Sequence, residues 1–195
     1  MPEIKPAEVP RLASHWPRAV AIEVSRTQFV ALWMAQDKAN DVVYLYEEHV
    51  VPLTAMPVHA DAVRKRGVWI PAIFDPEARG RQREDGLAIA HRLDELGVEI
   101  YTVPLNEDAG MLAIAERLTT GRLRAADTLM HWTREYQGWR RDEKGELPEE
   151  GGLLLRATAL VIQSGLQAAI TENQSKSDAE GYDMTDSTRS STTGY

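Results

Sequence analysis

The sequence predicts an α/β fold in which a mixed β-sheet of about five strands is flanked by helices. Three short apolar segments come first, and short turns separate them, which is typical of an antiparallel meander. Segments with helical periodicity then alternate with further strands, which is typical of βα units. The 195 residues are enough for one domain with a core of its own.

The three leading strands are predicted from composition and length. The segment 18–24, RAVAIEV, is a short apolar stretch of the kind that forms a buried strand. The segments 28–36 and 41–50 are rich in β-branched and aromatic residues, which favour strands. The turns between the three segments are only a few residues long, so neighbouring strands are expected to run antiparallel.

The middle of the chain changes to alternating helices and strands. A helical pattern covers 56–67, with Gly67 as its expected C-terminal cap. The segment 68–75 is the fourth predicted strand, and Pro71 within it suggests an edge position or a bulge. An amphipathic helix over 84–97, with Leu87, Ala90, Leu93 and Leu96 toward the core, and a fifth strand over 98–104 complete this part.

Helices dominate the last third of the sequence. Two are predicted at 109–120 and 125–137, and a final one at 152–170. Between them, the polar segment 139–148 resembles a small hairpin. Three antiparallel strands followed by βα units and helices form the element order of the ribonuclease-H-like fold.

Composition also suggests the domain limits. Prolines punctuate residues 1–16, which we interpret as a linker, and residues 17–170 form the predicted domain. From 171 to 195 the chain is rich in Ser, Thr and Asp and nearly free of aliphatic residues, so we expect a disordered acidic tail.

Charge and cysteine content narrow the function classes. The net charge of −8 argues against a protein that only coats DNA. The chain contains no cysteine, which excludes disulfides and thiolate metal sites. No stretch of eighteen apolar residues occurs, so no membrane partner is expected.

Two carboxylates stand at the ends of predicted strands. Glu23 is near the end of the first strand and lies between apolar neighbours, where an unpaired charge would be unfavourable. Asp75 ends the fourth strand. Because chemistry in open α/β sheets gathers at strand ends, Glu23 and Asp75 are candidate site residues.

The segment 19–165 resembles the nuclease domain of phage terminase large subunits, the DNA-packaging motor proteins. The similarity is carried by AIEVS on the first strand, by VVYLYEEH on the third, by the pattern DP-x-A-x-G-R-x-x-x-DG that begins at Asp75, and by the L-x-T-G-R-L block of 118–123. The last point of similarity is REYQGWRRDEKGELP, which precedes the final helix.

This resemblance implies a ribonuclease-H-like fold and a metal-dependent endonuclease that cuts concatemeric double-stranded DNA during packaging. It implies Mg²⁺ or Mn²⁺ in a two-metal site, since such ions are held by hard oxygen ligands, and it implies that Glu23 and Asp75 are catalytic groups and metal ligands of that site. The implied partners are duplex DNA, other terminase subunits and the portal, in the cytoplasm of the phage host. The ATPase motif G-x-x-x-x-G-K-[ST] does not occur in the sequence.

The final helix departs from the family pattern. Acidic residues are expected at its start, but the chain has GGLLLRATA, with Arg156 where a negative charge is expected. Glu149 or Glu150 is then a substitute metal ligand, or the domain is a catalytically silent module that binds DNA or docks in the motor. A resolvase or transposase domain of the same fold is a third hypothesis, and the L-x-T-G-R-L block does not favour it.

Basic residues beside the predicted site suit contacts to DNA phosphates. One group follows Asp75, and the other belongs to the predicted hairpin; alternatively, both are solvated charges. The candidates are Arg79, Arg81, Arg83, Arg140, Arg141 and Lys144.

Two further residues have plain structural interpretations. Asp85 is expected to be the N-cap of the helix that follows. The five histidines are scattered without metal-ligand spacing, and we expect His59 to lie on a helix surface.

Overall fold

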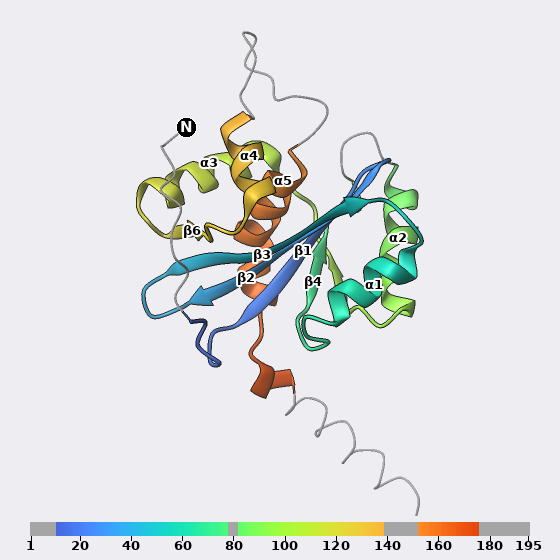
Figure 1. Ribbon diagram of the computed structural model, residues 1–195, viewed down its shortest axis with the longest axis horizontal. Coiled ribbons are helices and arrows are strands. Elements are labelled where there is room, and N and C mark those ends of the chain that lie inside the picture. The colour runs from blue at the N-terminus through green and yellow to red at the C-terminus, as the bar shows by residue number, and fades with distance from the viewer. Residues whose placement is uncertain (1–10, 78–81, 139–151, 176–195) are drawn as a thin grey trace, which may run out of the picture.

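The computed structural model describes residues 11–77, 82–138 and 152–175. Within these ranges the chain forms one six-stranded sheet with helices on both faces (Figure 1). The predicted α/β fold with a mixed sheet is confirmed. The prediction of about five strands misses a short sixth strand, β6 (Leu123–Ala125), which lies between two of the predicted helices.

The three leading strands form the antiparallel meander that the sequence predicts. They are β1 (Arg18–Val24), β2 (Gln28–Asp37) and β3 (Val42–Pro52). The short strands β4 (Ala72–Phe74), β5 (Ile100–Thr102) and β6 join them by parallel pairing. The resulting order is β5-β4-β1-β2-β3-β6, so β1 lies inside the sheet.

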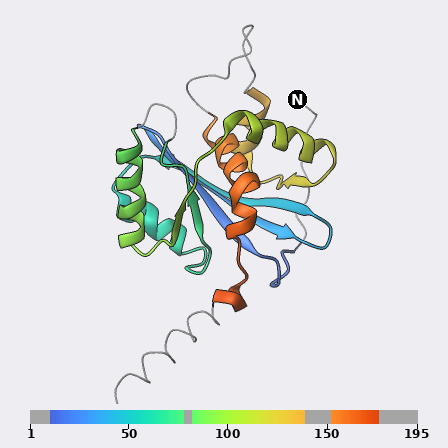
Figure 2. The same cartoon turned by 180° about the vertical axis from the view of Figure 1, so that it is seen from behind.

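One face of the sheet packs against α1 (Met56–Arg64) and α2 (Arg83–Glu95). The opposite face packs against α3 (Glu107–Thr119), α4 (Met130–Gly138) and α5 (Leu153–Leu160). After α5 the chain continues as a π-helical segment, Val161–Gly165, and the short α6 (Leu166–Ala168). Figure 2 shows α5 lying across the back of the sheet. No helix of the described residues is long and apolar enough to cross a membrane.

Several local predictions were wrong. Pro71 precedes β4, and β4 pairs on both sides, so the proline marks neither an edge strand nor a bulge. Leu87 was expected to face the core but is 41% exposed, because the buried face of α2 is formed by Ala90 and Leu93. Gln82 is the N-cap of α2, and Asp85 lies in its first turn. His59 is buried and stacks on Phe29, with ring centroids 4.3 Å apart.

A glycine allows α3 and α5 to approach closely. A Cβ atom built on Gly110 would lie 2.5 Å from the Cβ of Ala159 in α5. The amide of Gln163 reinforces this contact: its Nε2 donates to the carbonyl of Asn106 at 2.6 Å, and its Oε1 accepts from the Asn106 N–H at 3.2 Å. The beginning of α3 is therefore fixed against the helix that follows α5.

We predict that Gly110→Ala destabilises the protein by about 1–3 kcal/mol, because overpacking forces the two helices apart. The measurement is the free energy of unfolding in urea. Gly138→Ala is the matched control, since nothing lies within 4 Å of a Cβ at Gly138. Equal effects of the two substitutions would contradict the close contact between α3 and α5.

Candidate functional site

Parallel pairing of β1 and β4 brings the two predicted carboxylates together. Ile22 of β1 is paired with Phe74 of β4, so Glu23 and Asp75 are the next residues on neighbouring strands. Residues on a strand alternate between the two faces, and Ile22 and Phe74 belong to the core under α1 and α2. Glu23 and Asp75 therefore face α5 on the other side of the sheet.

A guanidinium group from α5 lies between these carboxylates. Arg156 Nη2 is 3.2 Å from Asp75 Oδ2, and Arg156 Nε is 3.6 Å from Glu23 Oε1. Arg156 Nη1 also donates a short hydrogen bond to Glu107 at the first position of α3. Three carboxylates from three elements thus share one cation, and we call Glu23, Asp75, Glu107 and Arg156 the arginine cage.

The arginine cage is almost fully removed from water. Glu23 has no exposed surface, Asp75 is 3% exposed and Arg156 is 6% exposed. Burial by itself would lower the pKa of Arg156, but attraction by Glu23, Glu107 and Asp75 outweighs it and raises that pKa above its usual value. Arg156 is therefore charged at every accessible pH, and it balances negative charge that burial would otherwise make very unfavourable.

The described residues of this site do not fit a two-metal centre. Two adjacent divalent cations need several carboxylate oxygens that face them, and a positive charge among those oxygens repels the metal. Arg156 supplies such a charge at the position where the family resemblance predicts an acidic ligand. No group of three His, Asp or Glu side chains in the described ranges has a geometry suited to a metal ion.

The start of α5 is held by a carboxylate from another helix. Gly152, the N-cap residue, has no side chain for capping and adopts a left-handed conformation with φ of 72°. Glu135 of α4 replaces the missing cap, because its Oε1 accepts from the N–H of Leu155 at 2.8 Å. Glu48 of β3 does the same for α4, accepting from the N–H groups of His131 and Trp132. These contacts fix the helix that carries Arg156.

Burial changes the protonation of Glu135. Loss of water contact raises the pKa of this carboxyl to about 7, and nearby Glu48 adds to the effect, while the N–H groups of α5 oppose it. Glu135 thus changes charge near neutral pH at the base of α5.

Only some of the predicted site residues lie within the part of the chain that the structure describes. Glu23 and Asp75 meet as expected. Arg83 is exposed at the start of α2 and pairs with Glu77. The other candidates lie outside the described residues, and these are Glu149, Glu150, Arg79, Arg81, Arg140, Arg141 and Lys144.

Sequence reasoning misses Glu107 and the full role of Arg156. The side chain of Asn106 caps α3 by accepting from the N–H of Ala109. Glu107 follows this cap, so the local sequence around Glu107 indicates only that a helix starts there. The sequence identifies Arg156 as a reversed charge, but its partners come from 49 to 133 positions away in the chain, counted from the residue numbers. Contacts between residues so far apart in the chain leave no pattern in the local sequence.

The mixed six-stranded sheet with helices on both faces is a ribonuclease-H-like fold. In this fold the chain is similar to solved large terminase nuclease domains. The P22 large terminase nuclease domain matches with a TM-score of 0.76 and 17% identity, over 88% of this chain and 91% of that domain. The SPP1 large terminase nuclease domain with bound Mn matches with a TM-score of 0.51 and 16% identity, over 76% and 86%.

A longer protein shows the same fold. A large terminase from a thermophilic bacteriophage matches with a TM-score of 0.65 and 17% identity over 82% of this chain. The match spans 42% of that longer chain, so the present sequence corresponds to less than half of that protein. The sequence matches no protein-family model and no curated protein. The similarity in structure therefore establishes the fold.

We predict that Arg156→Met destabilises the protein by roughly 3–5 kcal/mol, because it removes the cation that contacts the buried carboxylates of Glu23 and Asp75 and the partly exposed carboxylate of Glu107. The measurement is urea unfolding at neutral pH. Arg156→Lys keeps the charge but loses the forked geometry, so its effect should be smaller. Arg92→Met is the control: Arg92 pairs with Glu95 in solvent, and such pairs contribute about 0–1 kcal/mol. If Arg156→Met lowers the free energy of unfolding no more than Arg92→Met does, the arginine cage does not stabilise the fold as we propose.

We predict a pH-dependent contribution of Glu135 to stability. Its folded-state pKa is raised, so the folded protein binds the proton more tightly than the unfolded chain does. Stability from this group is therefore full below the ordinary carboxyl pKa of about 4.5 and is lost as the pH rises to about 7. Glu135→Gln keeps an acceptor oxygen but cannot ionise. The difference in unfolding free energy between parent and variant should change between pH 4.5 and about 7, and a constant difference would rule out the raised pKa.

Proposed function

We propose that the chain is the nuclease-fold domain of a phage terminase large subunit and that it acts on double-stranded DNA during genome packaging. The likeness to three large terminases supports this proposal, and so does the meeting of Glu23 and Asp75 at the shared ends of β1 and β4. In this proposal the chain works as part of a larger motor, with other terminase subunits and the portal as partners in the host cytoplasm.

We further propose that the domain is catalytically silent and serves as a DNA-binding or docking module. The contact of Arg156 with Glu23, Asp75 and Glu107 is the observation that carries this choice. A guanidinium cannot activate water as a metal does, because it has no vacant coordination position at which a water oxygen could bind and lose a proton. Its positive charge also offsets part of the negative charge that would otherwise attract divalent ions.

Metal-dependent cleavage of duplex DNA is the second candidate function. It is favoured by the juxtaposition of Glu23 and Asp75, which are the two ligands predicted from the sequence, and by the bound Mn of the SPP1 domain. This alternative requires Mg²⁺ or Mn²⁺ to displace Arg156, with Glu149 or Glu150 as further ligands.

Cleavage of supercoiled plasmid separates the two candidates. We predict that the parent protein does not nick the plasmid in Mg²⁺ or Mn²⁺, because Arg156 occupies the carboxylate cluster. The double variant Gly152→Asp/Arg156→Asp restores negative charge at the two positions of the final helix. It should nick in Mn²⁺, and adding Asp75→Ala should abolish the nicking.

The controls distinguish a silent domain from an unfolded one. Arg156→Lys keeps a cation in the cage and should be folded and silent. Circular dichroism checks that each variant retains its helices. Metal-dependent nicking by the parent, lost in Asp75→Ala, would establish the second candidate and reject the silent module.

A further inference from the structure

A row of residues crosses four strands at the end of the sheet where β1 begins. Arg18 of β1 is paired with Ala35 of β2, Ala35 with Tyr44 of β3, and Tyr44 with Arg124 of β6. Neighbouring strands are about 4.8 Å apart, so the backbones of the two arginines are separated by roughly 14 Å. We call Arg18, Tyr44 and Arg124 the arginine row.

Both arginines of the row lie over aromatic rings on one face of the sheet. The guanidinium carbon of Arg18 is 5.7 Å from the ring centroids of both Tyr46 and Trp69. The guanidinium carbon of Arg124 is 5.9 Å from the centroid of Tyr44. Trp16 stacks on Tyr44 at 5.2 Å with an interplanar angle of 8°. The rings thus fix the orientation of the cations.

Neither arginine of the row forms an ion pair within the part of the chain that the structure describes. Most of the described arginines elsewhere behave differently: Arg66, on the same face, pairs with Glu47. Acidic residues exceed basic ones in this chain, which has a net charge of −8, so carboxylates were available as partners. The Nε of Arg18 is buried and the Nε of Arg124 donates to the carbonyl of Gly121 at 3.4 Å, so the terminal Nη groups are the donors left for an anion.

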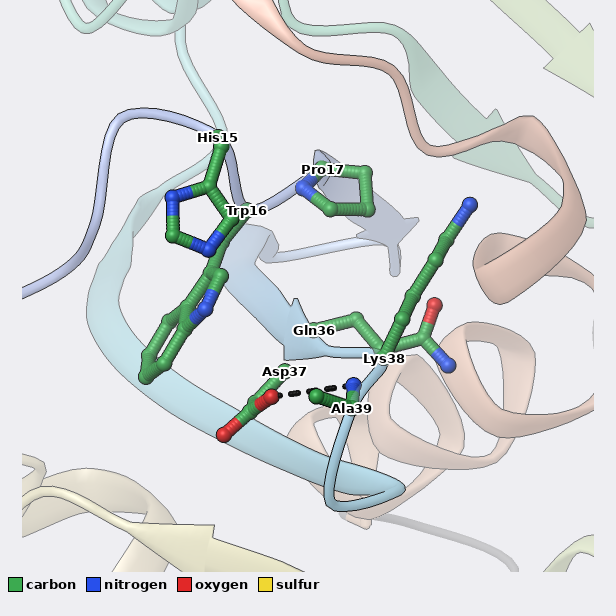
Figure 3. A pocket seen from close by; sticks show the side chains of 7 residues that line it. All are labelled: His15, Trp16, Pro17, Gln36, Asp37, Lys38 and Ala39. Atoms are coloured by element: carbon green, nitrogen blue, oxygen red, sulfur yellow. Dashed lines mark hydrogen bonds between the residues drawn. The ribbon is translucent and has the colours of Figure 1, made fainter.

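A hollow lies next to the row. Figure 3 shows Trp16 and Asp37 on one side of it, and the side chain of Lys38 is directed away from them. Asp37 is engaged in its own turn, because its carboxylate accepts from the N–H of Ala39 at 3.1 Å and from Asn40 Nδ2 at 2.7 Å. Lys38 is exposed and has no acidic partner among the described residues.

The row lies on the side of the sheet that α1 and α2 leave open. These helices cover the part of the face around β4 and β1, whereas β2 and β3 extend beyond them (Figure 1). Arg124 is exposed, and Arg18 and Trp16 are half-buried. Glu23 is five residues further along β1, about 17 Å away, so the row is separate from the arginine cage.

We infer that the arginine row is a docking surface for an acidic segment of a partner protein. Two oriented guanidinium groups without a carboxylate partner in the described ranges provide the charge complementarity. A nucleic-acid strand fits less well, because single strands bind by stacking bases on free aromatic faces, and here the rings already contact guanidinium groups or each other.

Fluorescence anisotropy with a labelled polyglutamate peptide of about ten residues tests this inference on the full chain at low salt. We expect binding that weakens as salt rises, because the contacts are ionic. The double variant Arg18→Gln/Arg124→Gln should lower the affinity at least tenfold. Arg18→Lys keeps the charge but loses the bidentate edge, so it should lower the affinity by a smaller factor.

The matched control removes the same charge elsewhere. Arg26 is exposed in the turn between β1 and β2, at the other end of β1, and Arg26→Gln should leave the affinity unchanged. Equal losses for Arg26→Gln and the double variant, or no binding by the parent, would overturn the inference. Tighter binding of a single DNA strand of similar length that depends on Arg18 would assign the surface to nucleic acid instead. Binding only after removal of residues 176–195 would assign it to the chain's own tail. Either result would contradict the inference that the arginine row binds an acidic segment of a partner protein.

Discussion

The contact of Arg156 with three carboxylates, of which Glu23 and Asp75 are buried, is the constraint on which the rest of this structure depends. Glu23 is near the end of the interior strand β1, Asp75 follows the neighbouring strand, and Glu107 begins α3. Arg156 offsets the mutual repulsion of these negative charges and the unfavourable burial of two of them. The close contact at Gly110, the cap from Glu135 and the parallel pairing of β1 with β4 all keep Arg156 within reach of them.

In this protein the fold is kept, but the charges at the site do not suit the metal chemistry that the family resemblance implies. The chain shares its fold with large terminase nuclease domains. An arginine stands at the position of the final helix where the sequence resemblance implies a carboxylate. A fold can keep its architecture while its site changes function. In our proposal the change converts a cluster suited to binding cations into a buried structural ion pair, and it leaves DNA binding or docking as the work of the domain.

The features that local patterns determine could be predicted from the sequence. The apolar composition of β1 to β3 and the helical periodicity of α2 indicate the element order, and the strand ends lead to Glu23 and Asp75. Features that depend on distant partners could not be predicted. The three-residue strand β6 is too short to show a period, and Glu107 joins the site through contacts 49 positions away, counted from Arg156. His59 was misplaced because a single histidine in a polar helix gives no sign of its stacking on Phe29.

Anomalous diffraction from crystals soaked in manganese would test the central claim most directly, because it locates Mn²⁺ independently of any activity. The arginine cage predicts no anomalous peak among Glu23, Asp75 and Glu107, with the guanidinium of Arg156 in contact with all three. A manganese peak coordinated by Glu23 and Asp75, with Arg156 turned away, would contradict the cage and show that the site is a metal centre.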